Sequence, residues 1–179
     1  PDGIITLVPL VLGRAYGDSD IHGFEIYMEL LGTRSRGAVT LRSDDPADLP
    51  SFRFNFLEDT RDTDAFRTGA KIMRSVVAQP AFDALRGKEL APGPDVASDE
   101  DLDTWIRKTA NVSHHLVGTC RMGKPDAPET VVAPDLKLVG LEGLRIADAS
   151  VMPIVPSANT HAAAIMIGEK ASDLIMAKR

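Results

Sequence analysis

The chain changes character at the run Asn111-Val-Ser-His-His-Leu-Val-Gly-Thr-Cys-Arg-Met-Gly123, which is extended and rich in small residues. Patterns typical of strands and then of amphipathic helices precede this run, and two short strand-like segments and one long helical pattern follow it. Strands and helices segregated in this way, without a βαβ alternation, predict an α+β fold in which helices pack on one face of an antiparallel sheet. We expect a boundary near residue 110, which would divide the chain into residues 1–110 and 111–179.

Extended chain is predicted in the N-terminal part of the sequence. Residues 5–12 and 24–32 are rich in side chains that favour strands. A turn at residues 34–37 leads into residues 38–42, where apolar and polar side chains alternate. This period of two predicts a half-buried antiparallel strand that has one face on a core and the other in water.

Two helices are predicted in the middle of the chain. The first follows a spacing of apolar residues on one helical face, begins at a cap formed by Asp59 or Thr60, and is stopped by Pro80. The second begins at Ser98, which has the spacing of a capping box, and its periodicity assigns Trp105 to the core.

The C-terminal part combines short strands with one long helix. Residues 136–139 and 144–147 have the pattern of strands, and the connection between them is flanked by glycines at positions 140 and 143. A final helix is predicted from about Thr160 to Met176.

Composition argues against several classes of function. The 179 residues are 44% hydrophobic and 26% charged, a balance typical of globular proteins. A net charge of -6 argues against a nucleic-acid partner, because such proteins carry clustered Lys and Arg. No apolar run approaches the roughly 20 residues that span a bilayer, so we expect no transmembrane segment.

Cysteine usage and the first residues bear on localisation. The single Cys120 excludes an internal disulfide and a multi-thiolate zinc site, and the cytoplasm is the expected compartment. The chain starts at Pro1, with no Met and no signal-type apolar stretch, which predicts an excised fragment whose targeting information lies upstream.

The histidines are the first candidates for chemistry. Of His22, His114, His115 and His161, the last three lie among small polar residues and not in an apolar helix stripe. Neighbouring residues on a strand point to opposite faces, so only one of His114 and His115 can face a given pocket. No metal is expected, because a zinc site needs three or four converging ligands and the sequence lacks a second cysteine.

A hydrolase is the alternative that would use the same residues. A cysteine hydrolase would pair Cys120 with His115, but their odd separation in an extended segment places them on opposite faces, and only His114 shares the side of Cys120. A serine hydrolase, with Ser113 as nucleophile, would prefer a Gly-x-Ser-x-Gly elbow, which the sequence lacks. A hydrolase is therefore the least favoured interpretation.

Three motifs follow one another in the last third: the run from His114 to Gly123, Leu144-Arg-Ile-Ala-Asp-Ala-Ser-Val-Met-Pro153, and Asn159-Thr-His161. In order and spacing they resemble the C-terminal signature of the glucose-methanol-choline (GMC) oxidoreductases. Ser35-Arg-Gly-Ala-Val-Thr-Leu-Arg-Ser-Asp-Asp-Pro46 resembles the strand and turn of that family's substrate domain. The resemblance covers most of the chain from about residue 30.

The resemblance implies an FAD-dependent enzyme that oxidises the CH–OH group of an alcohol by hydride transfer to flavin. Residues 1–110 would contribute to the substrate-binding domain, and residues 111–179 would form a catalytic and flavin-contacting segment of the FAD domain. The resemblance gives His115 the role of acid/base and Asn159 the role of orienting the oxygen of the alcohol. An imidazole suits the first role because it titrates near neutrality. Related enzymes often have a histidine at the position of Asn159. The asparagine makes this site resemble that of the choline and broad alcohol dehydrogenase branch.

Flavin contacts are also implied by the resemblance. Asp148 would contact the ribityl chain, with Ala149 beside it, although an aspartate here can also be a turn or cap residue. Thr160 and His161 begin the last helix, whose free N–H groups and positive dipole end suit the anionic edge of a reduced flavin. Asn159 can in addition serve as the N-cap of that helix.

One family feature is missing from the sequence. No Gly-x-Gly-x-x-Gly occurs, so the fingerprint that grips the ADP half of FAD is expected in an upstream FAD-binding domain of the same parent chain. That domain and an alcohol substrate are the expected partners, and the fragment alone is expected to be inactive. The alternative is a non-catalytic substrate-cap or interaction module of the same fold.

Overall fold

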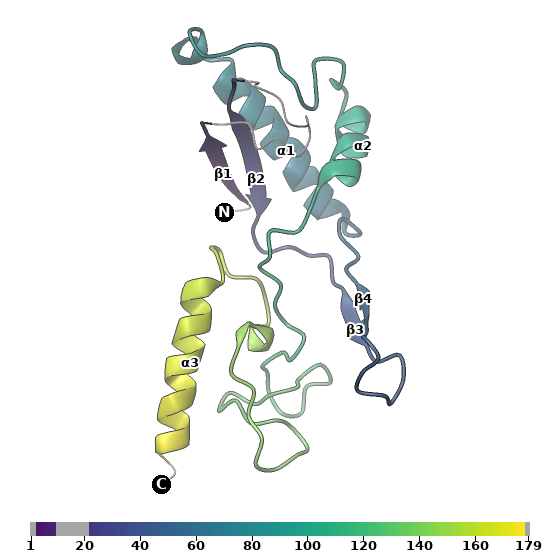
Figure 1. Ribbon diagram of the computed structural model, residues 1–179, viewed down its shortest axis with the longest axis vertical. Coiled ribbons are helices and arrows are strands. Elements are labelled where there is room, and N and C mark those ends of the chain that lie inside the picture. Colours follow the sequence, from purple (N-terminus) through teal and green to yellow (C-terminus); the bar gives the residue numbers. More distant parts are fainter. Residues whose placement is uncertain (1–2, 10–21, 178–179) are drawn as a thin grey trace. The chain divides into compact units, whose positions relative to one another are not determined.

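A computed structural model describes residues 3–9 and 22–177, and these form two compact units (Figure 1). Unit 1 contains the described residues up to Leu30 together with Leu57–Asn111, and unit 2 contains Leu31–Phe56 and the described residues from Val112 onward. The chain therefore passes between the units three times. One crossing, at residues 111–112, lies next to the boundary expected near residue 110, and residues 31–56 group with the C-terminal part.

The sheet of unit 1 is a pair of antiparallel strands. Strand β1 (Gly3–Val8) pairs with β2 (Glu25–Leu30), with Gly3 opposite Leu30 and Val8 opposite Glu25. Both predicted strands are thus present, although residues 10–12 of the first prediction lie outside the described residues.

Two capped helices complete unit 1. Helix α1 (Thr60–Val77) has Asp59 as its N-cap, whose carboxylate accepts from the Arg61 N–H at 3.0 Å. The helix ends before Pro80, which opens the short 3-10 helix η1 (Pro80–Phe82). Helix α2 (Asp99–Thr109) has Ser98 as its N-cap, and the Ser98 hydroxyl accepts from the Asp101 N–H at 3.0 Å. The predicted cap residues are confirmed.

Helix α1 packs on β2 on one side and on α2 on the other. Gly69 allows the close approach to the sheet, because a Cβ at this position would overlap the Met28 sulfur. The core of unit 1 consists of Leu57, Ala70, Leu102 and Ile106, with Trp105 partly buried against it as predicted.

A charged pair joins the two helices beside this core. The Arg67 guanidinium donates to both carboxylate oxygens of Asp103, from Nε at 2.7 Å and from Nη2 at 2.6 Å. The hydrogen bond from Arg67 holds the pKa of the Asp103 carboxyl below its usual range, and the same bond raises the pKa of Arg67.

Unit 2 begins with an antiparallel hairpin. Strand β3 (Ala38–Thr40) pairs with β4 (Ser51–Arg53), and Gly37 lies so close to the carbonyl oxygen of Arg53 that a Cβ would overlap it. All six strand residues are exposed, so the prediction that one face rests on a core is wrong. The alternation of side chains fixes which residues share a face, but burial also needs a layer packed on that face.

The remainder of unit 2 is mostly irregular. The predicted strands at 136–139 and 144–147 are wrong as regular strands: the two segments are hydrogen-bonded, but they form only isolated bridges such as Lys137 with Arg145. Leu136, Gly140 and Gly143 have φ between 66° and 83°, which breaks the pleat that a regular ladder needs.

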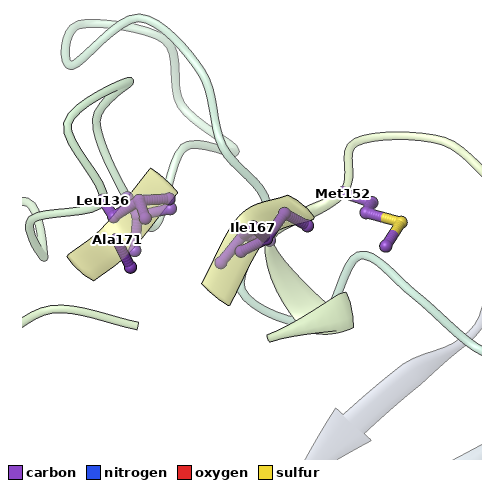
Figure 2. Close-up of a cluster of buried hydrophobic side chains, with 6 residues drawn as sticks. Leu136, Met152, Ile167 and Ala171 are labelled. Atoms are coloured by element: carbon purple, nitrogen blue, oxygen red, sulfur yellow. The ribbon is translucent and has the colours of Figure 1, made fainter. Parts of the chain in front are cut away.

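Helix α3 (His161–Met176) closes unit 2 and agrees with the predicted final helix. Its inner side packs on the irregular segments and on the short 3-10 helix η2 (Ala149–Val151). Figure 2 shows Ile167 and Ala171 of α3 with Leu136 and Met152 in the buried cluster that also contains Val132 and Val151. This core anchors the helix whose first residues belong to the candidate site.

Candidate active site

The segment that carries His115 is not a strand. His114 has φ of 62° and therefore turns the chain, and residues 112–118 have no regular structure. The prediction of an extended segment, in which side chains alternate, is wrong here. The turn still separates the two imidazoles by environment, since His114 is exposed and His115 is half-buried.

Beyond His115 the chain runs along η2. The N–H of Cys120 donates to Ser150 O at 3.0 Å, and the N–H of Met122 donates to Val151 O at 2.9 Å. Gly118 makes this approach possible, because its φ of 88° lies in the left-handed region and a Cβ would come within 3.3 Å of Met152 O. The glycine of the motif is therefore a packing requirement.

Both ring nitrogens of His115 contact residues at the start of α3. Asn159 Nδ2 lies 2.9 Å from His115 Nε2, and Thr160 Oγ1 lies 3.0 Å from His115 Nδ1. Residues that are 44 and 45 positions apart in the chain thus meet around one imidazole. The structure brings together the two residues predicted to be catalytic and adds Thr160, whose hydroxyl the sequence did not connect with His115.

Thr160 is the N-cap residue of α3, and the residue is buried at 9% exposure. No side chain caps the helix, because the Thr160 hydroxyl faces His115 and the Asn159 amide contacts the other ring nitrogen. The N-capping interpretation of Asn159 is therefore wrong. His161, the first residue of the helix, is exposed.

Asp148 and Ala149 lie at the start of η2. Asp148 is exposed and is its N-cap, since its carboxylate accepts from the Ser150 N–H at 2.8 Å. Ala149 is partly buried against the core of unit 2. The structure gives Asp148 the capping role that the sequence left open, and one carboxylate oxygen is engaged in it; contact with a flavin stays a prediction for both residues.

The other candidates are not assembled into a site within the described residues. His22 and His114 are exposed, and Cys120 is half-buried. Among residues 3–9 and 22–177, no three His, Cys, Asp or Glu side chains are grouped so that they could hold a metal ion. Around His115 the structure places Nε2 and the exposed Asn159 amide side by side.

Comparison with known proteins identifies the family. The family model described as GMC oxidoreductase matches residues 33–168, which include His115, Asn159 and Thr160. The chain belongs to the GMC oxidoreductase family. The α+β class and the family predicted from the three motifs are both confirmed.

The relatives include enzymes named for the oxidation of small molecules. An oxygen-dependent choline dehydrogenase of Rhizobium rhizogenes (strain K84) is 43% identical over 166 residues, which are 93% of this chain and 30% of that GMC protein. A formate oxidase of Aspergillus oryzae RIB40, studied for the modification of its FAD, superimposes with a TM-score of 0.90 at 26% identity over 100% of this chain and 32% of its own.

A fungal aryl-alcohol oxidase superimposes with a TM-score of 0.74 at 36% identity. The match covers 86% of this chain and 25% of the oxidase chain. The chain spans about 30% of the length of the choline dehydrogenase. Within the described part of the chain, no helix combines the length and apolarity needed to cross a membrane.

Proposed function

We propose that this chain is the C-terminal, catalytic-residue-bearing part of an FAD-dependent enzyme that oxidises the CH–OH group of an alcohol. The observation that carries the proposal is the pairing of His115 Nε2 with the Asn159 amide at 2.9 Å in a member of the GMC oxidoreductase family. Relatives named for choline and for aryl alcohols favour a primary alcohol as substrate.

In the proposed reaction, His115 takes the hydroxyl proton of the alcohol on Nε2. Imidazole suits this task because it exchanges a proton near neutral pH within hydrogen-bond reach. The exposed Asn159 amide lies next to Nε2, so its N–H can turn to the substrate oxygen and stabilise the charge that develops as the proton leaves. FAD, when bound, supplies the acceptor for the hydride that leaves the alcohol carbon.

The start of α3 has the donors that a flavin edge requires. The first intrahelical bond runs from the Ala164 N–H to Thr160 O at 2.9 Å, so the N–H groups of His161, Ala162 and Ala163 have no acceptor within the helix. The positive end of the helix dipole adds to their preference for an anionic group. In this proposal the backbone of Thr160 and His161 faces the flavin, together with Asp148 and Ala149.

The proposal assigns residues 1–110 to the substrate-binding domain and residues 111–179 to the catalytic and flavin-contacting segment. The ADP half of FAD would be held by an upstream domain of the parent chain, which agrees with a coverage of only 30% of the choline dehydrogenase of Rhizobium rhizogenes. The 179-residue chain by itself would then be inactive and bind FAD weakly.

The test is an anaerobic bleaching experiment on the full-length parent protein. A panel of primary alcohols is added without oxygen, and the visible flavin absorbance is recorded before and after. We expect one of the alcohols to bleach the flavin, His115→Ala to abolish bleaching, and His114→Ala, the exposed neighbour, to leave it intact. A folded parent protein that remains colourless after incubation with FAD, or bleaching that survives in His115→Ala, would contradict the proposal.

A further inference from the structure

The contact with Asn159 defines where the proton of the His115 ring lies. The nitrogen of an asparagine side chain can only donate, so His115 Nε2, which faces Asn159 Nδ2 at 2.9 Å, must be the acceptor and carry no hydrogen. In a neutral imidazole the hydrogen then belongs to Nδ1. Nδ1–H therefore donates to Thr160 Oγ1, which lies 3.0 Å away.

Thr160 is built to hold this position. Its side chain is buried, and a β-branched residue has few rotamers, so the hydroxyl has little freedom to turn elsewhere. The residue is also the N-cap of α3, whose Ile167 and Ala171 are anchored in the core of unit 2. The helix has no side-chain cap, and the hydroxyl that could have supplied one is given to His115 instead.

We propose that Thr160 is a positioning residue: its hydroxyl accepts from Nδ1–H, which supports the tautomer that the Asn159 amide selects and so keeps the lone pair of Nε2 available for the substrate proton. This inference rests on the proposed function of His115. Without the Thr160 hydroxyl, Nδ1–H loses its acceptor, and the Nε2–H tautomer becomes accessible if the Asn159 amide reverses and accepts through its oxygen. In that tautomer Nε2 cannot accept a proton. A base held in the wrong tautomer is ineffective even when its position is unchanged.

Thr160 serves both protonation states of His115, whereas Asn159 serves only one. After Nε2 has taken a proton, Nδ1–H still donates to Thr160 Oγ1, so the ring keeps its orientation. The Asn159 N–H has to leave Nε2 before the substrate proton arrives, because that nitrogen has a single lone pair, and it then turns toward the negatively polarised substrate oxygen. The fixed contact is thus on Nδ1 and the exchanging contact is on Nε2.

The experiment compares wild type, Thr160→Val and Thr160→Ser in the full-length, FAD-loaded protein. Valine keeps the shape and removes the hydroxyl, whereas serine keeps the hydroxyl. Two readouts are combined: the tautomer of His115, from the nitrogen resonances of ring-¹⁵N-labelled histidine assigned with His115→Gln, and the separate values of kcat and KM.

We expect the Nδ1–H tautomer in wild type and Thr160→Ser, and a shift toward Nε2–H in Thr160→Val. The kcat of Thr160→Val should fall by about ten- to a hundredfold, which is part of the rate factor of ~10²–10⁴ that a general base supplies. The KM should change little, and Thr160→Ser should keep most of the wild-type kcat. An Nε2–H tautomer in the wild type, or Thr160→Val with wild-type tautomer and kcat, would overturn the inference. If His115→Ala is inactive in that case, only the role of Thr160 fails and the proposed function stands.

Discussion

Replacement of Leu102 by alanine measures how much the core of unit 1 contributes to stability. Leu102 is 1% exposed, so nearly all of its side chain leaves water on folding. The change removes three carbons, and at about 0.8 kcal/mol for each buried carbon the transfer term is about 2.4 kcal/mol. The cavity that remains between α1 and α2 raises the expected loss in the free energy of unfolding to about 3–4 kcal/mol.

The assay is urea unfolding followed by tryptophan fluorescence. Trp105 is the only tryptophan in the sequence and packs against the same core, so its emission reports unit 1 directly. Leu85→Ala is the matched control, because Leu85 belongs to the same unit but is 72% exposed, and its loss should stay below about 0.5 kcal/mol. Equal unfolding midpoints for Leu102→Ala and Leu85→Ala would refute the assignment of Leu102 to a tightly packed core.

Two further predictions concern charge and backbone packing. The hydrogen bond from Arg67 lowers the pKa of Asp103 in the folded state. The contribution of this ion pair to the stability of the fold is therefore complete above the unfolded pKa of about 3.9 and is lost as pH falls through the lower pKa of the folded state. Asp103→Asn should therefore lower the thermal midpoint at pH 7 and flatten its decline below about pH 4, and an unaltered acid decline would count against the ion pair. Gly37→Ala should cost about 1–3 kcal/mol in urea unfolding followed by far-UV circular dichroism, because its Cβ would meet a backbone carbonyl. Gly168→Ala, in the same unit, meets nothing within 4 Å and should be neutral or slightly stabilising. Equal effects of the two alanines would contradict this packing.

The elements that the sequence predicted well are those with local signals. Asp59 and Ser98 cap helices through hydrogen bonds to residues two or three positions ahead, so a short stretch of sequence contains both partners. The hairpin face around Val39 was predicted to be buried, and the structure leaves it exposed at 47%. Three aromatic rings next to this hairpin, Phe52, Phe54 and Phe56, stack in sequence with centroids 6.4 and 5.1 Å apart. All three remain exposed, and the alternation of the sequence does not reveal this exposure.

The candidate site was predictable in its members but not in its geometry. The motifs pointed to His115 and Asn159, yet no spacing rule connects residues 44 positions apart, and their meeting depends on how η2 and α3 pack. Strand alternation, used to separate His114 from His115, failed because His114 takes a left-handed conformation. Thr160 was assigned to the flavin through its backbone, and the sequence has no signal for the contact of its hydroxyl with His115.

The imidazole of His115 is held by a dipeptide, Asn159-Thr160, whose two side chains grip opposite nitrogens of the ring. The two side chains belong to adjacent residues, so their spacing is fixed by covalent geometry. Inserting or deleting one residue between His115 and the start of α3 close to Asn159 would therefore remove both contacts together. The exposed connection at 140–143 has no such constraint and can accept changes in length. Variation among proteins with this architecture should accordingly gather in the connecting loops, and the start of α3 should keep its register.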